Sequence, residues 1–161
     1  MAVAEKQNMN TFEHSNIRFQ YPPHWLDASR LMLVQPADGT NIQIGKVRPD
    51  ADKSAEQFFG AYCSKVLDDL KPLGGQLLEM ADFQHERCIG KSFTLEFTDD
   101  SKQLWRQLHV ILPFGEDAYS FVWTVRESAF DAQRSEVNEM VGSFVVTPNS
   151  ESERRSYEFE D

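Results

Sequence analysis

Three long alternating runs in the second half of the chain most constrain its fold. Residues 87–97, 102–112 and 118–125 each place apolar side chains at every second position. Successive side chains of a strand point to opposite faces, so this period predicts strands. Only short turns separate the runs, at 98–101 and 113–116. Strands joined by short turns pair antiparallel, and the sequence therefore predicts an antiparallel meander.

Two segments have a helical period instead. Residues 54–57 read Ser-Ala-Glu-Gln, which matches a capping box, and an amphipathic pattern follows to about residue 70. A second helix is expected over 128–142. Further strands are expected over 11–14, 17–20, 29–35, 41–47, 76–83 and 143–146. This order predicts an α+β domain whose core is a curved antiparallel β-sheet flanked by two helices.

The length of 161 residues fits one domain. We expect that domain to span residues 11–147, after a frayed N-terminus at 1–10. Residues 148–161 hold five acidic and two basic side chains and are expected to form a disordered acidic tail.

Composition excludes several classes of protein. Sixteen basic against 26 acidic residues give a net charge of −10, whereas a nucleic-acid binder needs a basic surface. No run approaches the ~20 apolar residues of a membrane helix, so no stable membrane insertion is expected. The first residues lack the apolar core of a secretory signal, which favours a cytoplasmic protein over an exported one whose signal has been removed.

The sequence offers no recognisable catalytic or metal site. It holds four histidines but no Gly-x-Ser-x-Gly, His-x-His or His-Glu-x-x-His pattern. Cys63 and Cys88 lack ligand spacing, and whether they pair stays open. We therefore expect no enzyme activity, no catalytic residue, no metal and no cofactor.

A short motif follows the second expected strand. Pro22, Trp25, Asp27 and Ser29 form the pattern Pro-x-x-Trp-x-Asp-x-Ser. Trp25 can plug the end of the sheet, which we favour, or contact a ligand directly. The motif and the order of elements over 11–147 resemble the PsbP/DcrB-like superfamily, a sandwich fold. Within it, the chain is most similar to the Eag-type chaperones of bacterial type VI secretion.

The resemblance implies a non-catalytic adaptor that holds the apolar segment of a secreted effector before export, often as a homodimer. It places the binding surface on the strands after Trp25. If Leu31, Leu33, Ile42 and Ile44 form the core, alternation turns the opposite side chains outward. The strand expected over 102–112 either extends that patch or packs under the second helix. The candidate partner-binding residues are Trp25, Asp27, Arg30, Met32, Val34, Gln43, Trp105, His109 and Ile111.

One observation weakens the adaptor hypothesis, and a second suits a different function. Arg30 and Gln43 are polar where the Eag family tends to carry aliphatic residues. The acidic composition also suits an immunity protein that neutralises a soluble toxin through an acidic surface. That function is the alternative hypothesis, and in both cases the expected partner is a protein.

Overall fold

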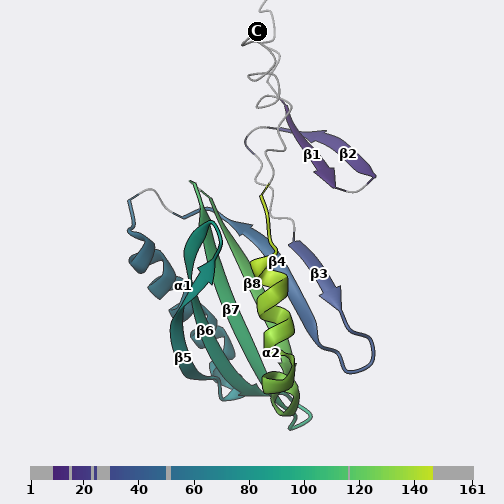
Figure 1. Cartoon of the computed structure of the whole chain (residues 1–161), viewed down its shortest axis with the longest axis vertical. Helices are drawn as coiled ribbons and strands as arrows, with labels where there is room; N and C mark the ends of the chain where they lie inside the picture. The colour runs from purple at the N-terminus through teal and green to yellow at the C-terminus, as the bar shows by residue number, and fades with distance from the viewer. Residues whose placement is uncertain are drawn as a thin grey trace, which may run out of the picture.

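The computed structural model describes residues 9–14, 16–22, 24, 30–49, 52–115 and 117–146 (Figure 1). Nearly all of the expected N-terminal extension and all of the expected tail lie outside these residues. The elements are β1 (Asn10–His14), β2 (Ile17–Tyr21), β3 (Arg30–Val34), β4 (Asn41–Val47), α1 (Ala55–Leu70), a 3-10 turn η1 (Lys71–Leu73), β5 (Gln76–His85), β6 (Cys88–Thr98), β7 (Leu104–Phe114), β8 (Asp117–Arg126) and α2 (Glu127–Gly142).

One six-stranded sheet forms the body of the protein, in the order β3-β4-β8-β7-β6-β5. Every neighbouring pair is antiparallel, and β5 to β8 follow one another as the predicted meander. Strand β4 joins the sheet beside β8, at the side of the meander away from β5. The expected α+β class, with a curved antiparallel sheet and two helices, is confirmed.

The two helices lie on opposite faces of the sheet (Figure 1). Leu108, Val110 and Leu112 of β7 belong to a core with α2, whereas Ile111 packs with Phe59 of α1. Residues 108–112 are therefore all buried, although they alternate between the two faces. Strand β7 therefore contributes side chains to two separate hydrophobic cores.

Helix α1 begins at the predicted capping box. The Ser54 hydroxyl accepts a hydrogen bond from the Gln57 backbone N–H at 3.1 Å, and the Gln57 side chain accepts one from the Ser54 N–H at 3.0 Å. The helix ends where Pro72 shifts the chain into η1, and Gly74 then takes a left-handed φ of 69°.

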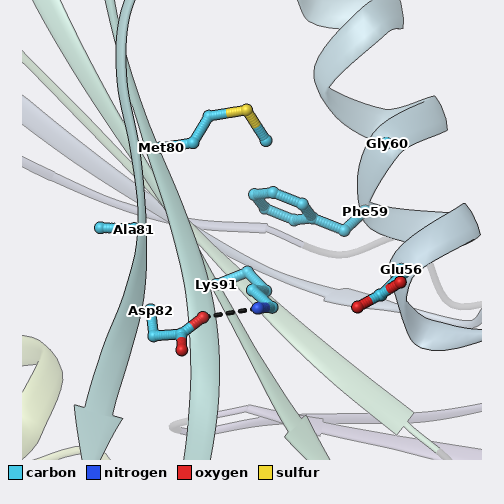
Figure 2. A pocket seen from close by; sticks show the side chains of 7 residues that line it. All are labelled: Glu56, Phe59, Gly60, Met80, Ala81, Asp82 and Lys91. Atoms are coloured by element: carbon cyan, nitrogen blue, oxygen red, sulfur yellow. Dashed lines mark hydrogen bonds and ion pairs between the residues drawn. The ribbon is translucent and has the colours of Figure 1, made fainter.

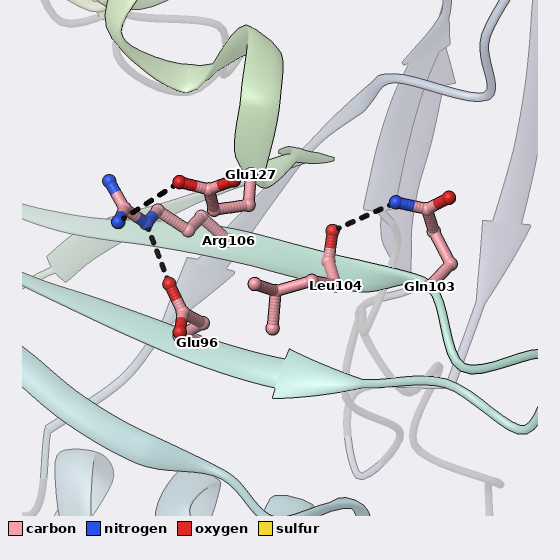
Figure 3. A network of polar contacts seen from close by, with 5 residues as sticks. All are labelled: Glu96, Gln103, Leu104, Arg106 and Glu127. Atoms are coloured by element: carbon pink, nitrogen blue, oxygen red, sulfur yellow. Dashed lines mark hydrogen bonds and ion pairs between the residues drawn. The ribbon is translucent and has the colours of Figure 1, made fainter.

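Helix α2 begins without a side-chain cap, and an ion-pair network ties its first turn to the sheet instead (Figure 3). Arg106 of β7 pairs with Glu96 of β6 at 2.9 Å and with Glu127 of α2 at 3.5 Å. The carboxylate of Glu127 also lies near the N-terminal end of the helix dipole, where negative charge is favourable.

The expected strand over 143–146 does not form. Phe144 instead packs its ring against Phe114, Tyr119 and Phe121, with centroids 4.9 to 5.8 Å away. His85 Nε2 lies 2.9 Å from the Phe144 carbonyl oxygen. An aromatic anchor thus fixes this segment where we expected a backbone ladder.

Strands β1 and β2 form a separate hairpin that projects away from the body (Figure 1). Among the described elements, it packs extensively only within itself. Phe12 and Phe19 stack at 4.8 Å on one face, which Ile17 and Tyr21 share by alternation. The other face is polar, so the hairpin is an amphipathic ribbon whose apolar face is largely uncovered; Phe19 is 51% exposed.

Removal of the side-chain cap of α1 tests whether the capping residue stabilises the start of this helix. Ser54→Ala leaves the Gln57 N–H without its acceptor, and we expect it to lower the free energy of unfolding by about 1 kcal/mol. Ser64→Ala, at an exposed position inside the same helix, should cause no loss. Urea denaturation of the two variants provides the comparison. Equal stabilities would contradict the capping role.

Candidate functional site

The face of the sheet toward α1 is covered only in part. Helix α1 packs mainly on β6, and neither described helix packs extensively on β3 or β4. We call this part of the sheet the open face. It comprises Arg30, Met32 and Val34 of β3, Asn41, Gln43 and Gly45 of β4, and Val122 and Thr124 of β8.

The structure brings four predicted residues together on the open face. Met32 and Val34 are 55% and 54% exposed. Arg30 is exposed beside them, and Gln43 is half-buried opposite Met32. These positions agree with the alternation argued from the sequence.

The expectation that Leu31 and Leu33 belong to the core is wrong. They point to the α2 face, as expected, but are 40% and 48% exposed. Helix α2 packs on β8, β7 and β5 and has no extensive packing with β3. Only Ile42 of the expected core in β3 and β4 is fully buried, with Ile44 partly buried beside it. Strand β3 therefore exposes apolar side chains on both of its faces.

Two other predicted residues lie on the same side of the sheet but are buried. His109 is 3% and Ile111 is 6% exposed. Ile111 packs with residues of α1, and the ring of His109 stacks on Phe93 at 4.5 Å. The predicted alternative, that these residues pack under the second helix, is wrong. They pack under the first helix, because odd-numbered positions of β7 point to α1.

Trp105 closes one end of this side of the sheet. Its indole N–H donates to Asp99 at 2.8 Å, and the Arg126 guanidinium lies 5.9 Å from its ring. The bond from Trp105 and two backbone N–H groups lower the pKa of Asp99. Trp105 is half-buried and held from two sides. Trp25 and Asp27, the remaining predicted residues, lie outside the described residues.

A chain of polar side chains crosses the sheet beside these residues. The hydroxyl of Tyr62 lies 3.3 Å from His109 Nδ1, and His109 Nε2 lies 2.6 Å from Gln107 Oε1. Gln107 Nε2 donates to the Thr124 hydroxyl at 3.0 Å. Sequence reasoning missed Tyr62, Gln107 and Thr124. The signal available for Gln107 was its place between Trp105 and His109 in the same alternating run.

Burial sets the protonation of this chain. Desolvation lowers the pKa of His109 to about 3, so its ring is neutral near pH 7. Burial also raises the pKa of Tyr62, which keeps its hydroxyl protonated. A neutral imidazole carries one N–H. That proton belongs on Nε2, facing the Gln107 oxygen, so Nδ1 accepts from Tyr62.

A separate hollow of about 450 Å³ lies between α1 and strands β5 and β6 (Figure 2). Phe59 of α1 and Met80 of β5 point into it, and an ion pair between Lys91 and Asp82 lies at one side. It contains none of the predicted residues. The residues that line the hollow include no Ser, Thr, Cys or His side chain.

The described part of the chain has neither the side-chain groupings of a metal site nor a helix that could span a membrane. No group of three His, Cys, Asp or Glu side chains there could hold a metal ion. Cys63 and Cys88 are both free thiols. Burial raises the pKa of each, which disfavours the reactive thiolate. Neither described helix is long and apolar enough to span a membrane.

Comparison with known proteins gives a likeness of fold. No family model and no curated protein matches the sequence. The structure is similar to the protein of unknown function PA94 from Pseudomonas aeruginosa, with a TM-score of 0.67 and 14% identity over 88% of this chain and 99% of that one. It is also similar to the PsbP of the cyanobacterium Synechocystis sp. PCC 6803 (CyanoP), with a TM-score of 0.49 and 10% identity over 91% and 97% of the two chains. A PsbP is thus among the similar structures, and neither match names an Eag-type adaptor.

The buried imidazole predicts a pH dependence of stability. The folded-state pKa of His109 lies below its ordinary value of 6.5, so below pH 6.5 the unfolded chain binds a proton that the folded one does not. The contribution of the buried neutral imidazole to stability is therefore fully present above pH 6.5 and is lost as the pH falls toward 3. Between pH 7 and pH 5 this loss amounts to about 2 kcal/mol.

His109→Gln should remove this part of the pH dependence, measured as the difference between urea unfolding free energies at pH 7 and pH 5. The exposed His24→Gln serves as the control and should behave like the wild type. An unchanged difference in His109→Gln would show that the imidazole is not kept neutral by the fold.

Proposed function

We propose that this protein is a non-catalytic adaptor that holds an apolar segment of a partner protein on its open face. The observation that carries the proposal is the pair Met32 and Val34 of β3, two neighbouring apolar side chains on the open face that are 55% and 54% exposed. Scattered apolar residues are normal on a surface, whereas a contiguous patch marks an interaction site.

The dimensions of the open face suit a helix. From β3 to β8 the sheet spans two strand spacings, or about 10 Å, close to the diameter of a helix with its side chains. Strand β3 limits the length of the open face, because it has 5 residues and extends about 17 Å. The open face can therefore hold about 11 residues of a helix, which is roughly half of a segment of about 20 apolar residues.

Such a segment needs a partner before it reaches a membrane. The resemblance to the Eag-type adaptors suggests that it belongs to a type VI secretion effector, held in the cytoplasm before export. Met32, Val34 and Val122 would bury its apolar side chains, and Tyr62 of α1 borders the site at His109. Removal of apolar surface from water drives this kind of association.

We also propose that the protein is a homodimer. The outer edge of β5 carries acidic Glu79 and Asp82 and a register shift between Leu77 and Glu79, which are features that discourage edge-to-edge pairing. Strand β3 pairs regularly with β4 and has only Arg30 as a charged residue. An isolated two-stranded hairpin is marginally stable in water, and among the described elements the β1–β2 hairpin packs extensively only within itself, so a partner would stabilise it. A second copy would satisfy both needs.

A co-purification experiment tests the adaptor proposal. The chain is co-expressed with a soluble carrier protein fused to a 20-residue Leu/Ala segment. Wild type should keep the fusion soluble and co-purify with it. Met32→Asp combined with Val34→Asp should reduce the captured fusion at least tenfold, because charges on the open face cannot be buried without a partner.

Ile89→Asp is the matched control, since Ile89 is 61% exposed on the same side of the sheet but at its far end. Its capture should equal that of the wild type. Failure of the wild type to capture the segment would refute the proposal. Binding of a soluble toxin that is lost at high salt, together with no binding of apolar segments, would favour the immunity protein instead.

Solution mass tests the homodimer. Light scattering should give twice 18.5 kDa for the wild type. Phe19→Lys, on the apolar face of the hairpin, should shift the mass toward the monomer, whereas Gln20→Lys on the polar face should not. A monomeric wild type at high protein concentration would exclude the dimer.

A further inference from the structure

The side chain of Arg30 lies across the open face. Arg30 is opposite Gly45 of β4, which is opposite Ser120 of β8 in the same cross-strand row. A Cβ atom placed on Gly45 would lie 3.4 Å from Arg30 Cγ, 3.8 Å from Arg30 Nε and 3.6 Å from Ser120 Oγ. The missing side chain of Gly45 therefore makes room for the stem of Arg30, which runs from the edge strand β3 over β4 toward β8.

The charge of Arg30 has no acidic partner in the described part of the chain. Its guanidinium forms no ion pair with a carboxylate there, whereas Arg48, Arg106 and Arg134 each pair with an acidic side chain. Acidic residues outnumber basic ones by 26 to 16, so the lack of a partner does not reflect a shortage of acids. Arg30 is also exposed, and a partner protein can therefore reach it.

Arg30 is the one charged side chain among the described residues of the open face. Met32 and Val34 follow it on the same face of β3, at steps of about 7 Å. Burial raises the pKa of Tyr62, and the positive charge of Arg30 acts against that rise. The guanidinium therefore lies within electrostatic reach of the phenol that borders the face at α1. A single cation thus marks one end of the open face, and apolar side chains lie farther along it.

We propose that Arg30 binds the carboxylate of an Asp or Glu residue in the otherwise apolar segment held on the open face. Asp and Glu are the side chains of a polypeptide that carry a full negative charge at neutral pH. A guanidinium can donate two parallel N–H bonds to the two oxygens of a carboxylate, which gives the contact both charge and a fixed geometry. The inference rests on the proposed adaptor function and adds the chemistry by which a segment is chosen and aligned.

The advantage of such a contact is alignment. Apolar contacts are non-directional, so a purely apolar helix could slide along the strands with little change in free energy. A carboxylate bound at one end of the face fixes one alignment, because sliding would leave Arg30 unpaired and carry the carboxylate onto Met32 and Val34. A lysine at the same place in the segment would be repelled. An ion pair at a partly exposed site corresponds to roughly a two- to fivefold preference.

The test compares two segments of the same shape that differ in charge. The chain is co-expressed with a carrier fused to a 20-residue Leu/Ala helix that carries either Glu or Gln at its centre. A central position leaves about ten apolar residues on one side, close to the number that the open face can hold. Relative to the amount expressed, wild type should capture the Glu segment roughly two- to fivefold more than the Gln segment. Arg30→Gln should remove this preference, because its side chain carries no charge.

Two further variants make the comparison specific. Arg30→Glu reverses the charge and should prefer a segment with Lys at its centre over the Glu segment, a reversal that a merely structural role of Arg30 would not produce. It also keeps the test informative if Arg30→Gln folds poorly. Arg48→Gln is the matched control, because it removes the same charge at an exposed position where Arg48 pairs with Asp117 at 3.6 Å. It should keep the wild-type preference for the Glu segment.

The outcomes separate the two proposals. Equal capture of the Glu and Gln segments by the wild type would overturn the inference while the adaptor function stands. A preference that persists in Arg30→Gln, or one that is lost in Arg48→Gln, would overturn it as well, because the effect would then not belong to Arg30. Capture of neither of these segments nor of the unsubstituted Leu/Ala segment would overturn the adaptor function and the inference together.

Discussion

Burial of strand β7 on both of its faces is the constraint on which the rest of the structure depends. Five consecutive residues of β7 are buried, so the strand needs cover on both faces, and a helix supplies it on each. Helix α2 covers Leu108, Val110 and Leu112, and α1 covers Ile111. The neutral His109 belongs to the same arrangement, because α1 excludes water from it.

The same constraint explains why one end of the sheet stays uncovered. A helix is about 10 Å wide and covers about two strands, whereas six strands span roughly 25 Å. With α2 over the central strands of one face and α1 mainly over β6 on the other, some strands lie beyond their reach. Those strands are β3 and β4, which are also the first to enter the sheet in sequence. The open face is therefore a product of the number and placement of the helices.

Alternation and capping made much of this fold predictable, and what failed depended on distant elements. The meander and the start of α1 follow from local patterns, and parity correctly grouped Arg30, Met32, Val34 and Gln43. Burial of Leu31 and Leu33 was wrong because it depends on how far α2 extends, and the strand expected at 143–146 was replaced by aromatic packing of Phe144. The pairing of Asn41 with Thr124 requires the register between β4 and β8, which no local pattern contains.

That long-range pairing has a consequence for how the protein is made. Strand β4 pairs with β8, which is the last strand of the sheet to leave the ribosome. Contacts between segments far apart in sequence form late, because closing the long loop costs entropy. The apolar residues 31–34 therefore emerge early and wait for most of the chain to be synthesised. During that interval they are exposed to aggregation, so the region proposed to protect a partner is the region most in need of protection during biosynthesis.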